Sequence, residues 1–137
     1  MKKKIFILCM ALAWTVTLMA QNIAVVNGSN TDIYHTLTEA IEGAAPGSVI
    51  YLPGGGFPIS DDVKITKPLT IIGIGHYAKS GNTGGISTIS GNLFFNSGSD
   101  RSAIMGCYIT GNVNLGEENA SVNDILIRYC NLNSVQV

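Results

Sequence analysis

Two stretches near the C-terminal end of the chain repeat one another, and this repeat constrains the fold more than any other feature. The pattern I-x-x-C-x-I followed by V-x-L in residues 104–115 returns as I-x-x-C-x-L followed by V-x-V in residues 127–137. The two cysteines are 23 residues apart and the two leading valines are 22 apart. Short runs of this kind cannot each bury a face alone, so they must stack on neighbouring copies. The repeat therefore predicts a solenoid of stacked parallel strands.

Short apolar runs separated by Ser, Asp, Asn and Gly also fill the chain before the repeat. They cover residues 57–59, 63–65, 69–72, 86–89 and 93–95. Such runs are typical of short strands joined by turns. An antiparallel sandwich uses strands of similar length and spacing, but it gives no reason for inward residues to recur by type after one full turn.

One segment, residues 36–45, has apolar residues at helical spacing. Thr36 and Glu39 form a capping box at its start, and Pro46-Gly47 ends it. The apolar run 49–52 follows directly and predicts the first strand of the stack. We expect the helix to cover the open N-terminal end of the stack, where unpaired strand edges would otherwise be exposed.

Two segments resemble a known family. Residues 36–54, T-L-T-E-A-I-E-G-A-A-P-G-S-V-I-Y-L-P-G, are similar to the N-terminal cap and first rung of right-handed parallel β-helix proteins of the pectate-lyase-like superfamily. Residues 63–73, V-K-I-T-K-P-L-T-I-I-G, are similar to the second rung. The resemblance extends as a repeat pattern over residues 31–137. It implies an all-β fold, a right-handed single-stranded parallel β-helix with an N-terminal capping helix, incomplete at its C-terminus, and it does not specify an enzyme.

The first 20 residues have the pattern of a signal peptide. Three lysines are followed by a 15-residue apolar stretch, residues 5–19, and Ala20 precedes a plausible cleavage point. An uncleaved membrane anchor would need about 20 apolar residues. We therefore expect residues 21–137 to form one domain, secreted or at the cell surface of a bacterium, with no membrane insertion after cleavage.

Residues 21–137 carry five basic and nine acidic side chains, a net charge of 5 − 9 = −4. With no basic patch to neutralise phosphates, nucleic-acid binding is not expected. Cys107 and Cys130 occupy equivalent positions of the repeat. Equivalent side chains on parallel strands point the same way, so we expect two stacked, buried thiols and no disulfide.

Catalytic residues are hard to find. Lyases of the superfamily hold Ca²⁺ with several carboxylates and use an Arg or Lys as the base, which makes Asp100, Asp124 and Arg128 a candidate polar face. Hard cations need several converging oxygens, however, and these residues lie in turn-rich sequence. No catalytic or metal-binding residue is assigned and no cofactor is expected, with Ca²⁺ entering only if the chain belongs to a lyase.

Five asparagines are expected at turns, where their amides stack as ladders, with sugar binding as the second interpretation: Asn92, Asn112, Asn114, Asn131 and Asn133. His35 and His76 have no other ligand at a suitable spacing, so metal binding by them is not expected.

The strand pattern runs to Val137, so we expect an N-terminal piece of a longer protein, or self-association through an open C-terminal edge. The favoured function is a secreted structural or surface-interaction module that displays loops for adhesion or carbohydrate contact. The alternative is the N-terminal part of a polysaccharide lyase or glycoside hydrolase whose catalytic rungs lie beyond residue 137. A small self-associating binding protein is the third interpretation, and whether the chain is enzymatic stays open.

Overall fold

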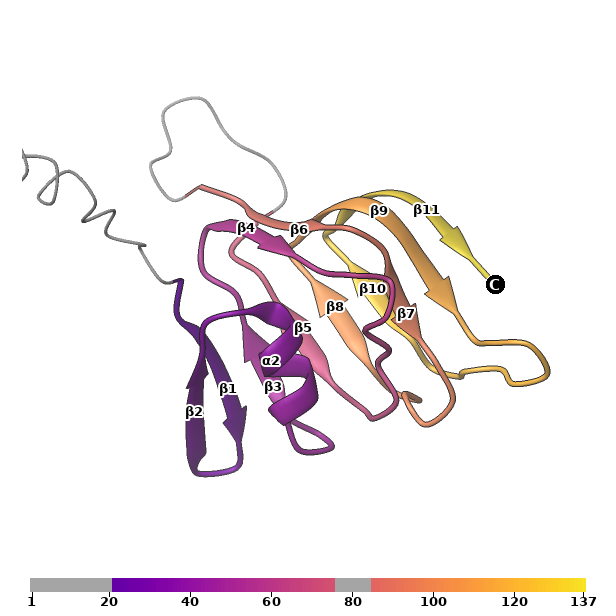
Figure 1. Ribbon diagram of the computed structural model, residues 1–137, viewed down its shortest axis with the longest axis horizontal. Helices are drawn as coiled ribbons and strands as arrows, with labels where there is room; N and C mark the ends of the chain where they lie inside the picture. The colour runs from indigo at the N-terminus through magenta and orange to yellow at the C-terminus, as the bar shows by residue number, and fades with distance from the viewer. Residues whose placement is uncertain (1–20, 76–84) are drawn as a thin grey trace, which may run out of the picture.

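The computed structural model describes residues 21–75 and 85–137, and it builds them from two sheets and one short helix (Figure 1). The expected signal peptide and His76 lie outside the described residues. The first sheet is mixed, in the order β10-β8-β5-β3-β1-β2. Its strands are β1 (Ile23–Asn27), β2 (Asn30–Tyr34), β3 (Val49–Tyr51), β5 (Thr70–Ile72), β8 (Ala103–Met105) and β10 (Leu126–Arg128).

The second sheet is parallel, in the order β11-β9-β6-β4, and β7 pairs with β9 beside this path. Its strands are β4 (Gly55–Pro58), β6 (Ser87–Ser90), β7 (Leu93–Phe95), β9 (Tyr108–Leu115) and β11 (Asn131–Gln136). From β3 onward the chain passes back and forth between the two sheets, as Figure 1 shows. The apolar core is enclosed between them.

The N-terminal strands form an antiparallel hairpin that the sequence analysis did not foresee. Ile23 and Val25 are buried on one side of β1, and Gly28 makes the turn with φ 60°, a conformation that glycine adopts without strain. Strand β1 pairs antiparallel with β2 on one side and with β3 on the other. The hairpin thereby closes the edge that β3 would otherwise expose.

The expected fold class is therefore wrong. A right-handed single-stranded parallel β-helix needs parallel neighbours throughout, whereas the structure has one mixed sheet and one parallel sheet with a single short helix. The solenoid and the resemblance to the pectate-lyase-like superfamily are corrected with it. The physical reason lies in residues 23–34, where a tight turn folds two strands back on each other instead of starting a stack.

The local pairings predicted from the C-terminal repeat are confirmed. Ile127 lies opposite Ile104 in the parallel pair β10 and β8. The same offset brings β11 onto β9, where Val135 lies opposite Val113. Ile104 and Val113 are fully buried, and Ile127 and Leu132 of the second copy pack against this core, whereas Val135 is 45% exposed.

The helix is also confirmed. Helix α2 (Leu37–Gly43) begins after Thr36, whose hydroxyl accepts a hydrogen bond of 3.2 Å from the backbone N–H of Glu39. Its buried residues, Leu37 and Ile41 among them, pack against β1 and β2. No helix within the described residues has the length and apolar character needed to cross a membrane.

Candidate functional site

The outer face of the parallel sheet carries the most regular set of polar side chains on the molecule. Along β4, β6 and β9 the inward residues Phe57, Ile89 and Ile109 are buried in the core. Because side chains alternate along a strand, their neighbours point outward. Register pairs Gly56, Thr88, Tyr108 and Asn131 in a first row across the strands. Pro58 pairs with Ser90, and by alternation Thr110 and Asn133 follow on β9 and β11, beside the register shift between Leu132 and Ser134, which gives a second, irregular row. We call these eight residues, six of which have polar side chains, the polar face; it shares no residue with the candidate polar face of the sequence analysis.

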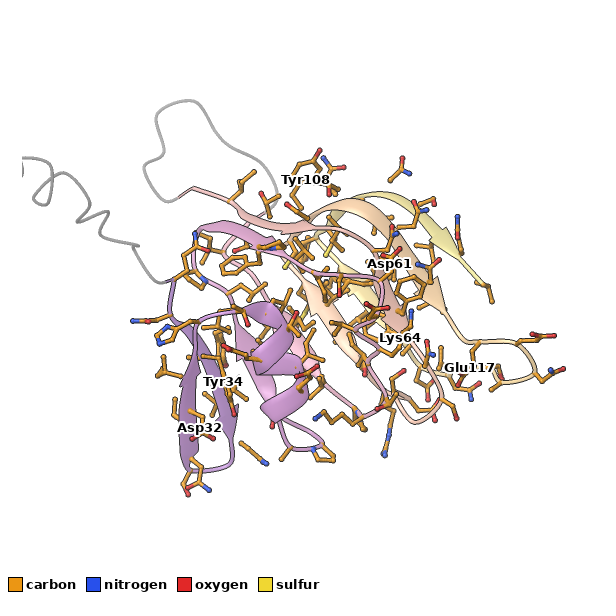
Figure 2. The ribbon with its side chains drawn as sticks, in the orientation of Figure 1. Asp32, Tyr34, Asp61, Lys64, Tyr108 and Glu117 are labelled. Carbon is orange, nitrogen blue, oxygen red and sulfur yellow. The ribbon has the colours of Figure 1, made fainter. Side chains whose placement is uncertain are left out.

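A hollow of about 250 Å³ lies at the β9 and β11 side of the polar face. Tyr108, Thr110, Asn131 and Asn133 line it together with the one residue between them on each strand, Ile109 on β9 and Leu132 on β11. Figure 2 shows Tyr108 projecting away from the sheet at its outer side. An aromatic ring thus stands beside two amides and a hydroxyl in one shallow, solvent-open depression.

A chain of side-chain hydrogen bonds fixes the border of the polar face. Asn92 donates from Nδ2 to Oδ1 of Asp61 at 3.1 Å, and its own Oδ1 accepts from the backbone N–H of Asn112 at 2.9 Å. Oδ1 of Asn112 in turn accepts from Nδ2 of Asn133 at 2.8 Å and from the hydroxyl of Ser134 at 2.9 Å. The amide ladder expected from the asparagines is therefore present, and it holds Asn133 in one orientation.

The ladder corrects one detail of the sequence analysis. Asn112, Asn114, Asn131 and Asn133 lie within strands β9 and β11 rather than at turns. Asn114 donates from Nδ2 to the carbonyl oxygen of Leu93 at 3.3 Å, so it ties β9 to β7. Strands β9 and β11 have eight and six residues, and their pairing continues on both sides of a register shift between Leu132 and Ser134.

Asp100, Asp124 and Arg128, the candidate polar face of the sequence analysis, form no hydrogen bond with one another among the described residues. Oδ1 of Asp100 accepts from the backbone N–H of Asn123 at 2.7 Å, so this carboxylate joins two neighbouring loops. Asp124 lies before β10 with a φ of 56°, and Arg128 is the last residue of that strand. Arg128 lies over the ring of Tyr129, with its guanidinium carbon 4.7 Å from the ring centre.

Both cysteines are free thiols. Cys107 is fully buried, whereas Cys130 is half-buried. Cys107 lies between β8 and β9 in the chain, and Cys130 lies between β10 and β11. The backbone N–H of Asn131 donates to the carbonyl oxygen of Cys107 at 3.0 Å. Burial, followed by the charge of Cys130, raises the pKa of the Cys107 thiol to about 12. Cys107 is therefore protonated at neutral pH.

Within residues 21–75 and 85–137, no group of three His, Cys, Asp or Glu side chains could hold a metal ion. His35 lies exposed between β2 and α2, apart from any such group. Three carboxylates, those of Asp61, Asp100 and Glu117, accept hydrogen bonds from neighbouring amides.

No family model, curated protein or solved structure matches the chain. The function must therefore be argued from the polar face itself. Sequence analysis considered two of its asparagines and missed its tyrosine and its three hydroxyl residues. The signal that could have found them is the alternation S-T-I-S at residues 87–90 and Y-I-T at residues 108–110, where polar residues flank one buried isoleucine.

Proposed function

We propose that this protein is a secreted bacterial surface-interaction module that contacts carbohydrate through the polar face and catalyses no reaction. The observation that carries the proposal is the hollow in which Tyr108 stands beside Asn131, Asn133 and Thr110. Sugars present hydroxyl groups at their edges and apolar C–H surfaces on their ring faces. A ligand with both kinds of surface requires an aromatic platform together with a few fixed polar groups.

Rigidity supports the proposal. Asn133 is held by Asn112, and the hydroxyl of Thr110 accepts from the backbone N–H of Gly91 at 3.3 Å. Side chains that are already ordered lose little conformational entropy when a ligand binds, so a shallow face can still give measurable affinity. Residues placed on strands are also more precisely positioned than residues on loops.

The absence of an assembled acid and base supports a non-catalytic role for the described residues. Ordinary glycoside hydrolysis needs two carboxylates at a defined separation. Neither row of the polar face, all eight positions of which lie in the described part of the chain, contains a carboxylate. The face is equipped to hold a sugar chain and not to cleave one.

The test is binding of residues 21–137 to a panel of insoluble polysaccharides, measured as depletion from the supernatant. We expect Tyr108→Ala to reduce the retention that the unmodified protein shows, through an affinity about tenfold weaker. Tyr51→Ala is the matched control, because Tyr51 is 46% exposed on the outer face of the other sheet. Retention that survived Tyr108→Ala, or was lost equally in Tyr51→Ala, would contradict the assignment of the polar face.

A further inference from the structure

The polar face is uncharged. None of its eight positions, each within the described residues, is Lys, Arg, His, Asp or Glu. The charged residue of the bordering ladder, Asp61, accepts a hydrogen bond from Asn92. An acidic polymer would meet no cation on this face, and the net charge of −4 over residues 21–137 would repel it. A cationic polymer would meet no carboxylate there.

The polar face is longer across the strands than along them. Strands β4 and β6 have four residues each, so each contributes two outward positions, about 7 Å apart along the strand. Across the sheet, each row crosses four strands, which at about 4.8 Å per step gives roughly 14 Å. A linear ligand therefore makes most contacts when it lies perpendicular to the strands.

The two rows repeat similar chemistry at each step. Thr88, Tyr108 and Asn131 are paired in register in the first row. Ser90, Thr110 and Asn133 follow them by alternation in the second row. The distance between neighbouring strands is close to the advance of one sugar ring in an extended chain. Successive rings would thus meet one polar or aromatic side chain from each strand.

From this geometry, and resting on the proposed function, we propose that the ligand is an uncharged, extended polysaccharide that lies across the strands of the parallel sheet. One ring packs on Tyr108. The amides of Asn131 and Asn133 bond the hydroxyls of this ring and of the next one. Because Nδ2 of Asn133 is engaged by Asn112, its Oδ1 is oriented to accept from a sugar hydroxyl.

The first experiment is a length series. Titration calorimetry would measure the affinity of residues 21–137 for linear gluco-, xylo- and manno-oligosaccharides, from the monosaccharide upward. We expect the affinity for at least one series to rise until the chain spans about 14 Å, roughly three rings, and then to level off. A monosaccharide that bound as tightly as the longer chains would overturn the across-strand arrangement.

The second experiment tests charge. Polygalacturonate and chitosan serve as acidic and cationic probes beside the neutral polymer that binds best. We expect binding of the neutral polymer to be unchanged between low and high salt, since exposed charges contribute nothing that salt could screen. Preference for either charged polymer, with affinity that falls as salt rises, would overturn the inference and leave carbohydrate binding intact.

Variants distinguish carbohydrate binding by the polar face from the arrangement of the ligand across the strands. We expect Tyr108→Ala to weaken the neutral ligand about tenfold, the effect of losing one aromatic contact. Asn131→Ala should weaken only oligosaccharides longer than one ring, whereas Tyr51→Ala should bind as the unmodified protein does. Failure to bind any sugar polymer would overturn the proposed function itself. Binding that ignored both Tyr108→Ala and Asn131→Ala would place the site elsewhere.

Discussion

The two thiols should differ in reactivity by orders of magnitude, although the repeat places them at equivalent positions. Cys107 is 0% exposed and its Sγ donates to the carbonyl oxygen of Met105 at 3.4 Å. Burial is the largest cause that raises the pKa of Cys107 from 9.0 to about 12, the charge of Cys130 adds to it, and a hydrogen bond with the backbone of Gly73 acts against it. Cys130 is half-buried.

The magnitude follows from the thiolate population. Only the thiolate attacks an alkylating reagent. A thiol with a pKa of about 12 has roughly a thousandfold less thiolate at pH 8 than one with a pKa of 9.0. Steric exclusion of the reagent from the core lowers the rate of Cys107 further. We therefore expect native alkylation of Cys107 to be at least about a thousandfold slower than in the unfolded chain.

The assay uses two single-thiol variants of residues 21–137, which exclude Cys9. These variants, Cys130→Ala and Cys107→Ala, are treated with iodoacetamide in the native state and in denaturant without reductant. Mass spectrometry gives the labelled fraction with time. The protein that keeps only Cys130 should label measurably in the native state, and the one that keeps only Cys107 should label only after unfolding. Equal native rates would refute the reasoning. In the unmodified protein, labelling that needed reductant even in denaturant would show a disulfide and refute it as well.

Four further outcomes are expected. Between pH 9.0 and about 12 the folded state keeps the Cys107 proton that the unfolded chain has lost. The free energy of unfolding should therefore fall by about 1.4 kcal/mol per pH unit over this range. Urea unfolding measured across pH should show this slope in the unmodified protein and not in Cys107→Ala. Ser87→Ala removes a buried hydroxyl that accepts from one backbone N–H and contacts two carbonyl oxygens. Urea unfolding should show that the free energy of unfolding falls by about 1–3 kcal/mol. The change in the exposed control Ser90→Ala should be less than about 0.5 kcal/mol. Sedimentation of residues 21–137 should show self-association through the edge of β11 that no other described strand pairs. Val135→Lys should reduce it because a charge blunts edge pairing, and equal association would remove the edge from the interface. Residues 21–137 should release no unsaturated product from polygalacturonate with or without Ca²⁺, and activity lost on Arg128→Ala would contradict the non-catalytic interpretation.

Sequence patterning predicted short-range features and failed on the sheet as a whole. The capping box at Thr36 and the 23-residue offset of the cysteines each describe contacts within one element or between consecutive copies, and both kinds of contact are present. The hairpin of residues 23–34 was missed because its inner strand reads as a short apolar run, while β2 is exposed at four of its five positions and carries no apolar periodicity. One antiparallel hairpin was enough to change the fold class.

The candidate site was less predictable than the fold. The amide ladder could be inferred because Asn92 and Asn112 lie 20 residues apart at matching positions of the pattern. The polar face could not be inferred from the sequence. The alternation in Y-I-T shows that two side chains lie on the same face of one strand, but it does not show which residues of the next strand lie beside them. That information is the register of β6, β9 and β11, which depends on how long each intervening loop is and where the strand bulges.

The outer faces of the two sheets show that sugar binding depends more on the residues around a tyrosine than on the tyrosine ring itself. Tyr51 and Tyr108 both point outward, each from a strand whose other side faces the core. Tyr51 borders a hollow of about 290 Å³ whose other lining residues are mostly apolar, with Ile72 and Ile74 among them. The hydroxyl groups of a sugar placed there would lose hydrogen bonds to water and form almost none with the protein. The free energy lost would exceed the free energy gained from contact with the tyrosine ring. Beside Tyr108, amides and a hydroxyl replace the water. The same residue type therefore favours a sugar on one sheet and disfavours it on the other, which is why Tyr51→Ala is the control that gives Tyr108→Ala its meaning.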